Sequence, residues 1–596
     1  MPQAFSTPGI YRKETDLSNV VKPVGTSIGA MVGRANQGPV NQRILINTNK
    51  QFVQTFGAPT TSADFAHYGA MQFLNESANL WMVRCTYGDE KYANATFPVG
   101  IATATSASQI SSTNVSAISS TAGLTGVWAD GYTLKTQDGD PGINDIESFG
   151  SFGTGLNIAS IGPGTYGNNI GIAIITCASS LSGTSYPYGF NWQNKYDTTP
   201  TLTSANSAAM IWPQVYRVNV YVKDANADTA TVWAGGVSGT TSVESFLVSN
   251  NRIKDATGNS LFAPFVINGS SNYIYIKKAN ISSSYPADTT AVGIVALSNG
   301  GNSSTATTGQ KLAAAQALYS DKTKVTIDML ITPDVVTTSD ASYIQGIGNI
   351  AATRMDCIAV TQCSSLTATS RATINSELAN FSFSGPSYVA PYVGYDKIYD
   401  TYTDSEVFIP KAIAGAVIMA RTDRVANTWD APAGVNRGII GYSIGQNTVL
   451  SEADIGAIYD NNANTSKFIN GYGNVLWGQK TAQKKATALD RINVRRLLLY
   501  IENTIEPSLL PFLYEENTSR TRSRLSGIID SFLSKVKAGG GLYDYKVVCD
   551  LTNNTADDID LNLLNADIYV QPTKTIEFIQ LQTIITRTGS SFNEVV

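Results

Sequence analysis

Two stretches in which strand and helix patterns alternate, far apart in the sequence, most constrain the fold of this 596-residue chain. The first covers residues 23–98, where Leu80–Cys85 is a continuous apolar run, typical of a strand buried on both faces. The second begins near residue 306 and places a helical pattern over Tyr343–Arg354 between two apolar strands. Strand, helix and strand at this spacing predict a parallel βαβ crossover. We therefore expect one α/β (α+β) conserved core with a split sheet, formed by residues 23–98 and 306–574.

The material between these stretches differs in composition. Ile101–Ala122 consists almost entirely of Ala, Ser and Thr, which fits either a flexible surface tract or weak strands. Further along, strands are broken by turns, and Val215–Val222 alternates as a strand with one solvated face does. We expect an inserted outer domain over residues 99–160 and an inserted β-rich domain over residues 161–305.

Both ends of the chain have the pattern of extended arms. In residues 1–22 a Pro-Gly turn begins a short extended segment, and a polar stretch separates it from the first buried strand. Residues 575–596 begin with a long β-prone segment and end in a polar tail. An unpaired strand of this kind is an aggregation hazard, so it must pair with its own sheet or with another copy of the protein.

Composition excludes several classes of function. The formal net charge of −5 gives no general attraction to nucleic acid or to an anionic membrane. No apolar run approaches the roughly 20 residues that span a bilayer, and no secretory signal peptide is visible. We expect a soluble protein without stable membrane insertion. Five cysteines, without a Cys-x-x-Cys pair, argue against a zinc site or a disulfide framework and favour buried free thiols.

The chain offers little for catalysis. It has one histidine, His67, which excludes a multi-histidine metal site, and we expect it on a helix surface or at the edge of the core. Gly473–Thr481 resembles a phosphate-binding loop, but Gln479 stands between the glycine and the lysine, and Val475–Trp477 has a strand pattern. The acidic run Asp557–Asp560 fits a solvated loop or an intersubunit contact better than a cation site. We therefore expect no catalytic residues, no cofactor and no metal.

A basic segment runs from Lys480 to Arg496. Nucleic-acid binding would be one interpretation, but the segment lacks interleaved aromatic residues and the chain is acidic overall. The charge is more consistent with an acidic surface on a protein partner, where it would set register more than affinity.

Several segments resemble signature segments of the contractile tail sheath proteins of myovirus-type bacteriophages. They lie near both ends of the chain and also in its middle, and the most specific of them is Trp429–Gly438. Residues 99–160 show no such resemblance. The segments are Thr7–Glu14, Val24–Ala35, Gly38–Val40, Gly162–Asn169, Lys411–Asp423, Trp429–Gly438, Gly471–Gly478 and Ile492–Glu502.

The resemblance implies a structural subunit and no enzyme. Such subunits polymerise as stacked hexameric rings around a tail tube and contract from a metastable extended state to drive the tube through the host envelope. The implied partners are copies of the chain itself, the tail tube protein, and the baseplate and tail terminator proteins, without nucleic acid. The implied location is the virion, after assembly in the host cytoplasm. The alternative is the sheath of a phage-like bacteriocin or of another contractile injection system.

In this family, arms of neighbouring subunits add strands to a subunit's core sheet, which assigns candidate contact residues to both arms. An ordinary edge strand of the chain's own domain is the alternative for the hydrophobic arm residues. The N-terminal arm would be shaped by Pro8, Gly9, Ile10 and Tyr11, and the C-terminal arm by Ile576, Phe578, Ile579, Leu581, Ile584 and Ile585. Possible tube or sheath contacts are Arg491, Arg495 and Arg496.

Overall fold

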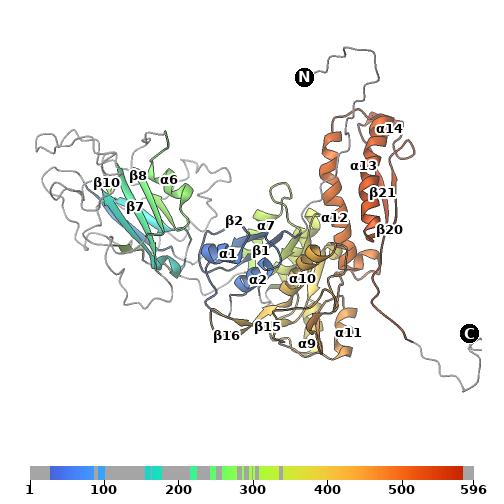
Figure 1. Cartoon of the computed structure of the whole chain (residues 1–596), viewed down its shortest axis with the longest axis horizontal. Coiled ribbons are helices and arrows are strands. Elements are labelled where there is room, and N and C mark those ends of the chain that lie inside the picture. Colours follow the sequence, from blue (N-terminus) through green and yellow to red (C-terminus); the bar gives the residue numbers. More distant parts are fainter. Residues whose placement is uncertain are drawn as a thin grey trace, which may run out of the picture.

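The computed structural model places a β-rich unit, a central α/β part and a helical C-terminal part along the long axis of the molecule (Figure 1). It describes residues 27–62, 64–85, 92–100, 155–162, 164–176, 215–223, 242–249, 258–277, 285–286, 294–298, 300–301, 308–334 and 340–581. The expected N-terminal arm (residues 1–22) and the Ala/Ser/Thr tract Ile101–Ala122 lie outside these residues.

The central part is built on a six-stranded sheet to which two distant stretches of the chain contribute. β1 pairs in parallel with β3 on one side and with β12 on the other, so Gly29 lies opposite both Leu80 and Met329. All pairs in the sheet are parallel except the edge pair of β2 with β3. Across the sheet the order is β14 (Val389–Tyr392), β13 (Ile358–Gln362), β12 (Met329–Ile331), β1 (Gly29–Gly33), β3 (Leu80–Arg84) and β2 (Arg43–Ile46).

Helices cover both faces of this sheet. Successive strand residues point to opposite faces, and both sets are apolar, so each face is buried under helices. Met31 joins one hydrophobic cluster, whereas Ala30 and Val32 join the other. The first cluster includes residues of α1 (Asn49–Phe56), α2 (Phe65–Leu74) and α10 (Lys411–Val425). The second includes residues of α7 (Thr308–Tyr319), α8 (Ala341–Arg354) and α9 (Arg371–Leu378).

The predicted parallel crossover is confirmed. The crossover from β12 through α8 to β13 joins parallel neighbours, with Met329 opposite Ile358. α1 begins after Thr48, whose side chain accepts a hydrogen bond from the Gln51 amide, and ends before Gly57 at a positive φ of 86°. The expected fold class therefore holds at the level of a mixed α/β protein with several sheets.

The expected position of His67 is wrong. We placed it on a helix surface or at the edge of the core, but its side chain is fully buried. α1 packs against α2 at this point, so that His67 Nε2 lies 3.2 Å from the carbonyl oxygen of Phe56 and the imidazole meets the Phe52 ring edge-on. Burial lowers the pKa of His67, which favours the neutral imidazole.

In its described residues, the β-rich unit has two four-stranded antiparallel sheets and α6 (Ala263–Ser270). Buried residues of both sheets, such as Ile158 and Ile172, belong to one hydrophobic cluster. The described parts of residues 99–160 and 161–305 therefore share a core, while the domain boundaries stay a prediction. One sheet has the order β10 (Tyr285–Pro286), β4 (Asn94–Gly100), β5 (Gly155–Ser160), β9 (Ile274–Lys277); the other has β11 (Val295–Ala296), β6 (Ile170–Thr176), β7 (Val215–Val222), β8 (Glu244–Ser249).

The C-terminal part contains the helical pair α12 and α13, packed on a two-stranded sheet of β20 and β21. Leu497, Ile501 and Ile505 recur at four-residue spacing on α12 and are buried against α13, whose apolar face includes Leu525 and Ile529. The elements are α12 (Ile492–Leu509), α13 (Ser519–Ala538), β20 (Leu542–Val548), α14 (Ala556–Asp560) and β21 (Asp567–Pro572).

Smaller elements connect the sheet to this helical part. They are β15 (Tyr395–Asp400), β16 (Ser405–Pro410), β17 (Gly445–Gln446), α11 (Glu452–Asp460), β18 (Ser466–Ile469) and β19 (Gly473–Leu476). Short 3-10 turns are η2 (Thr165–Asn169), η6 (Pro386–Tyr388), η7 (Ala488–Asp490) and η8 (Leu510–Phe512).

The β-rich unit meets the central part at a close backbone approach. A Cβ atom on Gly162 would lie 2.0 Å from the carbonyl oxygen of Gly38, which is closer than any real contact of this kind. The same carbonyl accepts a 2.8 Å hydrogen bond from Arg84, a buried side chain that also lies over the ring of Tyr166. The close contact between the β-rich unit and the central part therefore requires glycine at position 162.

Replacing Gly162 with alanine should lower the free energy of unfolding by about 1–3 kcal/mol, because the added methyl group collides with backbone that cannot move independently. Chemical denaturation of the full chain measures this. Gly269 lies in α6 of the same unit with open space around its Cβ position, so Gly269→Ala is the matched control. Equal stabilities of the two variants would contradict the close approach.

Candidate functional site

The C-terminal segment, residues 573–581, runs extended along the body of the protein after β21 ends at Pro572. It is no part of any strand ladder among the described residues. Its side chains alternate in exposure: Thr575 and Glu577 are half-buried, whereas Ile576 and Phe578 are each 83% exposed. From Thr575 to Phe578 the segment thus alternates as a strand does, with polar side chains on the body and apolar side chains in solvent, whereas residues 579–581 are all exposed.

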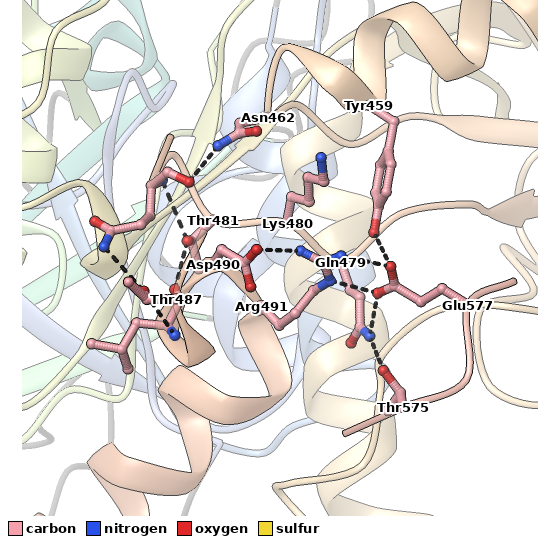
Figure 2. Close-up of polar contacts among 12 residues, drawn as sticks. Tyr459, Asn462, Gln479, Lys480, Thr481, Thr487, Asp490, Arg491, Thr575 and Glu577 are labelled. Carbon is pink, nitrogen blue, oxygen red and sulfur yellow. Dashed lines mark hydrogen bonds and ion pairs between the residues drawn. The ribbon is translucent and has the colours of Figure 1, made fainter. Parts of the chain in front are cut away.

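Glu577 fixes this segment to the body (Figure 2). Arg491 donates to both of its carboxylate oxygens, from Nε to Oε1 at 2.7 Å and from Nη2 to Oε2 at 2.8 Å. Gln479 donates to Oε1 at 3.0 Å and also to the Thr575 hydroxyl at 2.6 Å, while the Tyr459 hydroxyl donates to Oε2 at 3.0 Å. We call Tyr459, Gln479, Arg491, Thr575 and Glu577 the C-terminal anchor.

Local backbone pairing brings the body side of the anchor together. Lys480 and Arg491 form an isolated antiparallel bridge, and the Ile492 amide donates to the carbonyl oxygen of Gln479 at 2.8 Å. This pairing aligns the side chains of Gln479 and Arg491 at the start of α12. Tyr459 comes from the last turn of α11.

The electrostatics of the anchor favour an ionised Glu577. Burial by itself would raise the pKa of Glu577, but hydrogen bonds from Arg491 and Gln479 and the positive charge of Arg491 outweigh it, so the pKa lies below its ordinary value. Burial raises the pKa of Tyr459, and the neighbouring Glu577 charge adds to this, so the phenol stays a hydrogen-bond donor. A carboxylate held by a two-point arginine contact is a strong and directional interaction.

Lys480 completes the surroundings of the anchor. Its ammonium group lies 4.4 Å from the centre of the Tyr459 ring, within the range of a cation–π contact. Burial lowers the pKa of Lys480, and the nearby Arg491 charge contributes. The two cations therefore flank the tyrosine that binds Glu577.

The three arginines that we expected as tube or sheath contacts lie at the start of α12 but differ in surroundings. Arg491 belongs to the anchor. Arg495 and Arg496 are only 5% and 4% exposed, which differs from the surface position that the expected role implies. Arg495 donates to the Ser387 hydroxyl and stacks 4.0 Å from the centre of the Tyr388 ring, whereas Arg496 donates to Asp423. These three charges have partners within the chain, because helix packing turns this part of α12 inward.

The expected arm residues fall into two groups. Four of them are exposed on the C-terminal segment: Ile576 and Phe578, as described above, and Ile579 and Leu581, which are 80% and 91% exposed. Outside the described residues lie Pro8, Gly9, Ile10, Tyr11, Ile584 and Ile585. The contact role of all these residues stays a prediction.

Sequence reasoning missed the residues that hold the C-terminal segment. Glu577 is the first acid in a long apolar stretch, and the basic segment that starts at Lys480 could have suggested its partner. Gln479 was noted because it breaks the resemblance to a phosphate-binding loop, and Val475 is confirmed as part of a strand, β19. Gln479, which argued against a phosphate-binding loop, is therefore a residue of the C-terminal anchor.

The described part of the chain offers binding geometry and no evident reaction chemistry. Within it, no group of three or more His, Cys, Asp or Glu side chains is placed to hold a metal ion. Cys85, Cys357, Cys363 and Cys549 are buried free thiols, while Cys177 lies outside the described residues. Among the helices described, none combines the length and apolarity needed to cross a membrane.

Replacing Glu577 with glutamine should loosen the C-terminal segment, because the charged contact with Arg491 is lost. We expect docking to weaken by about 1 kcal/mol, the scale of a hydrogen-bonded charge at a partly exposed site. Trypsin cleavage after the exposed Lys574, followed by mass spectrometry, reports the change. The control is Glu506→Gln, which removes a carboxylate from an exposed ion pair with Lys322. Equal cleavage of the two variants would count against the anchor.

The anchor should also depend on pH. The pKa of Glu577 is lower when the segment is docked, so docking is fully stabilised above the ordinary glutamate value of 4.5 and weakens as the pH falls through the depressed value. Amide hydrogen exchange over residues 573–581, corrected for the intrinsic pH effect, should therefore rise as the pH falls below the ordinary glutamate value of 4.5. Glu577→Gln should show no such rise, and an identical pH response in both proteins would refute the assignment.

Comparison with known proteins connects this geometry with a family. The model of the phage tail sheath C-terminal domain matches residues 484–586, a range that includes α12 and three of the five anchor residues. The tail sheath protein of Enterobacteria phage T4 is 29% identical over 99% of this chain and 99% of its own length. The tail sheath protein of Vibrio phage KVP40 is 40% identical over 34% of this chain and 30% of its own length.

A solved structure shares the fold. The sheath tail protein from Listeria innocua superposes with a TM-score of 0.51 at 11% identity, over 92% of this chain and 96% of its own. The relative that matches along the whole length and the matching C-terminal model agree with the segments singled out in the sequence. The chain is similar to a phage tail sheath protein over its whole length, and its C-terminal part matches the model of the phage tail sheath C-terminal domain.

Proposed function

We propose that this sheath subunit assembles with copies of itself through its terminal segments, as stacked hexameric rings around a tail tube. In this proposal the assembly contracts from a metastable extended state and drives the tube through the host envelope. Its partners are further copies, the tube protein, and the baseplate and terminator proteins of the tail. The chain acts as a virion component assembled in the host cytoplasm.

The observation that carries the proposal is the C-terminal segment, which is anchored on one side and apolar on the other. Ile576 and Phe578 point away from the body on a segment that Glu577 holds in an extended form. An exposed apolar row on a strand without a ladder is what β-augmentation requires of the added strand. A neighbouring copy that pairs with this segment would bury the row and satisfy its backbone groups.

The sheet formed by β20 and β21 is our candidate for the receiving surface. A two-stranded sheet is marginal in water on its own, and both outer edges of this one are unpaired among the described residues. α13 covers one face, while Tyr543 and Tyr569 are exposed. Strands from neighbouring copies would extend this sheet at its edges.

The six-stranded sheet and the β-rich unit have separate roles in the proposal. We infer that the split sheet with its two helical layers is the conserved core, and that the β-rich unit is inserted material that projects outward. Strand pairing would hold subunits in a mesh while their cores move past one another. Differences of even ~1–3 kcal/mol per contact, summed over many subunits, would drive contraction from a kinetically trapped state.

Replacing Phe578 with aspartate should abolish assembly and leave a folded monomer, because the exposed side chain contributes nothing to the single chain and its burial between copies would then enclose a charge. Negative-stain microscopy and sedimentation measure assembly, and circular dichroism reports folding. The matched control is Gln580→Asp, which adds the same charge at an exposed polar position of the same segment. Tubes of normal length from Phe578→Asp would overturn the proposed role.

Deleting residues 1–20 should likewise abolish tube formation while the monomer stays folded and soluble. The same two measurements apply. Wild-type tubes from the truncated protein would refute the assignment of an N-terminal arm.

A further inference from the structure

The point where the chain enters the central sheet is held by two carboxylates. Ser27 Oγ donates to Asp423 Oδ2 at 3.1 Å, and the next residue, Ile28, donates its amide to Asp328 Oδ2 at 2.9 Å. The Ser77 hydroxyl donates to the carbonyl oxygen of Ser27. We call this arrangement the N-terminal exit, since the N-terminal segment leaves the body here.

Arg496 of α12 holds Asp423 in place. Its Nη2 lies 2.6 Å from both carboxylate oxygens of Asp423, and the two side chains are almost fully buried. A buried carboxylate without a cation is strongly unfavourable, so Asp423 can face Ser27 only while Arg496 compensates its charge. Arg496 therefore acts on the N-terminal exit through Asp423.

The second carboxylate of the exit depends on the same cation. Burial raises the pKa of Asp328 to about 7, the negative charge of Asp423 adds to the shift, and the positive charge of Arg496 opposes it. Asp356 adds a further negative charge nearby. Arg496 thus binds one of the two carboxylates at the point where Ser27 and Ile28 enter the sheet, and its charge also acts on the other.

The same helix carries the cation of the C-terminal anchor. Arg491 is the N-cap residue of α12 and binds Glu577, while Arg496 lies five positions further on. With a rise of 1.5 Å per residue, this spacing is about 7.5 Å along the helix axis. The N-cap and the first residues of α12 therefore carry both cations: Arg491, which binds Glu577 near the C-terminus, and Arg496, which acts on Ser27 through Asp423.

We propose that the start of α12 is a shared rigid mount that fixes the direction in which both terminal segments leave the body, with Arg496 and Arg491 as its positioning residues. In the single chain the mount holds Ser27 through Asp423 and the C-terminal segment through Glu577. The consequence for assembly rests on the proposed function. If the segments link neighbouring copies, the mount sets the angle between the incoming and the outgoing linkage.

Amide hydrogen exchange on the full-length monomer tests the mount directly. We expect Ser27→Ala and Arg496→Lys to raise exchange severalfold in the peptide that contains Ile28 and Gly29, without a change over residues 573–581. Glu577→Gln should have the reverse pattern. Ser27→Ala removes a single hydrogen bond and keeps the test valid if Arg496→Lys does not fold. Unchanged exchange near Ile28 in the variants that fold, or a rise at both ends from each substitution, would overturn the proposal.

A glycine pair tests whether the mount is shared. Asn493→Gly weakens the first turn of α12, and Asn503→Gly places the same substitution later in the same helix. Both asparagines donate a side-chain hydrogen bond to a backbone carbonyl, of Trp429 and of Asp356 respectively, so the losses are matched. Exchange should rise at both ends with Asn493→Gly and at neither with Asn503→Gly. A rise at one end only, or none, would refute a common mount.

Sedimentation of Ser27→Ala and Glu577→Gln separates the mount from its consequence. Slower assembly of both variants, with folded monomers, supports the link to the proposed function. If exchange changes as expected but assembly keeps its normal rate, the mount holds in the monomer and its role in assembly is overturned. The proposed function itself is tested independently by Phe578→Asp.

Discussion

The parallel pairing of β1 with β12 is the contact on which the rest of the molecule depends. It joins Gly29 to Met329 in the middle of a six-stranded sheet and thereby joins the N-terminal and C-terminal parts of the α/β fold. The entropic cost of closing a loop rises only slowly with length, by about 0.6 kcal/mol per doubling. The long β-rich passage between the two strands therefore adds little to the cost of pairing β1 with β12. The described part of that passage has a hydrophobic core of its own, separate from the two clusters on the six-stranded sheet.

The N-terminal exit lies against a helix that packs on this sheet. α10 packs across the sheet and carries Asp423 near its end, where it meets Ser27 just before β1. α12 packs beside it through Arg496. Because the exits are attached to a helix on the sheet and not to loops, their directions follow from the core packing.

Sequence reasoning succeeded where a local pattern fixes the outcome. The apolar run that forms β3, the crossover through α8 and the face of α13 were predictable, because burial on one or both sides leaves a repeating signature. His67 was misplaced because its burial depends on α1, a partner that its own helix pattern does not reveal. The shared core of the two β-sheets was missed for the same reason, since pairing between distant strands leaves no periodic signal.

The candidate site was predictable in part. Apolar residues of the C-terminal segment were recognised from their β propensity, and the basic segment was expected to face an acidic surface. For Arg491 that acid lies in the same chain, at Glu577, because sequence shows the sign of a charge but not the location of its partner. Buried charges at Arg495 and Arg496 were taken as surface charges, since helix packing alone decides which side of α12 faces inward.

The magnitudes separate two roles within the C-terminal segment. The partly exposed contact of Glu577 with Arg491 contributes about 1 kcal/mol to docking, which suffices to orient a strand but not to hold subunits together. Burial of an exposed Ile, Leu or Phe contributes about 1.5–3 kcal/mol each, and four such residues lie on the segment between positions 576 and 581. Affinity between copies would therefore come from the apolar row and the backbone ladder, and the anchor would determine where that row is presented. In the proposed function, such a division would allow the linkage to persist while the bodies rotate, because the strong contacts would lie on the segment and the weak contact at its start.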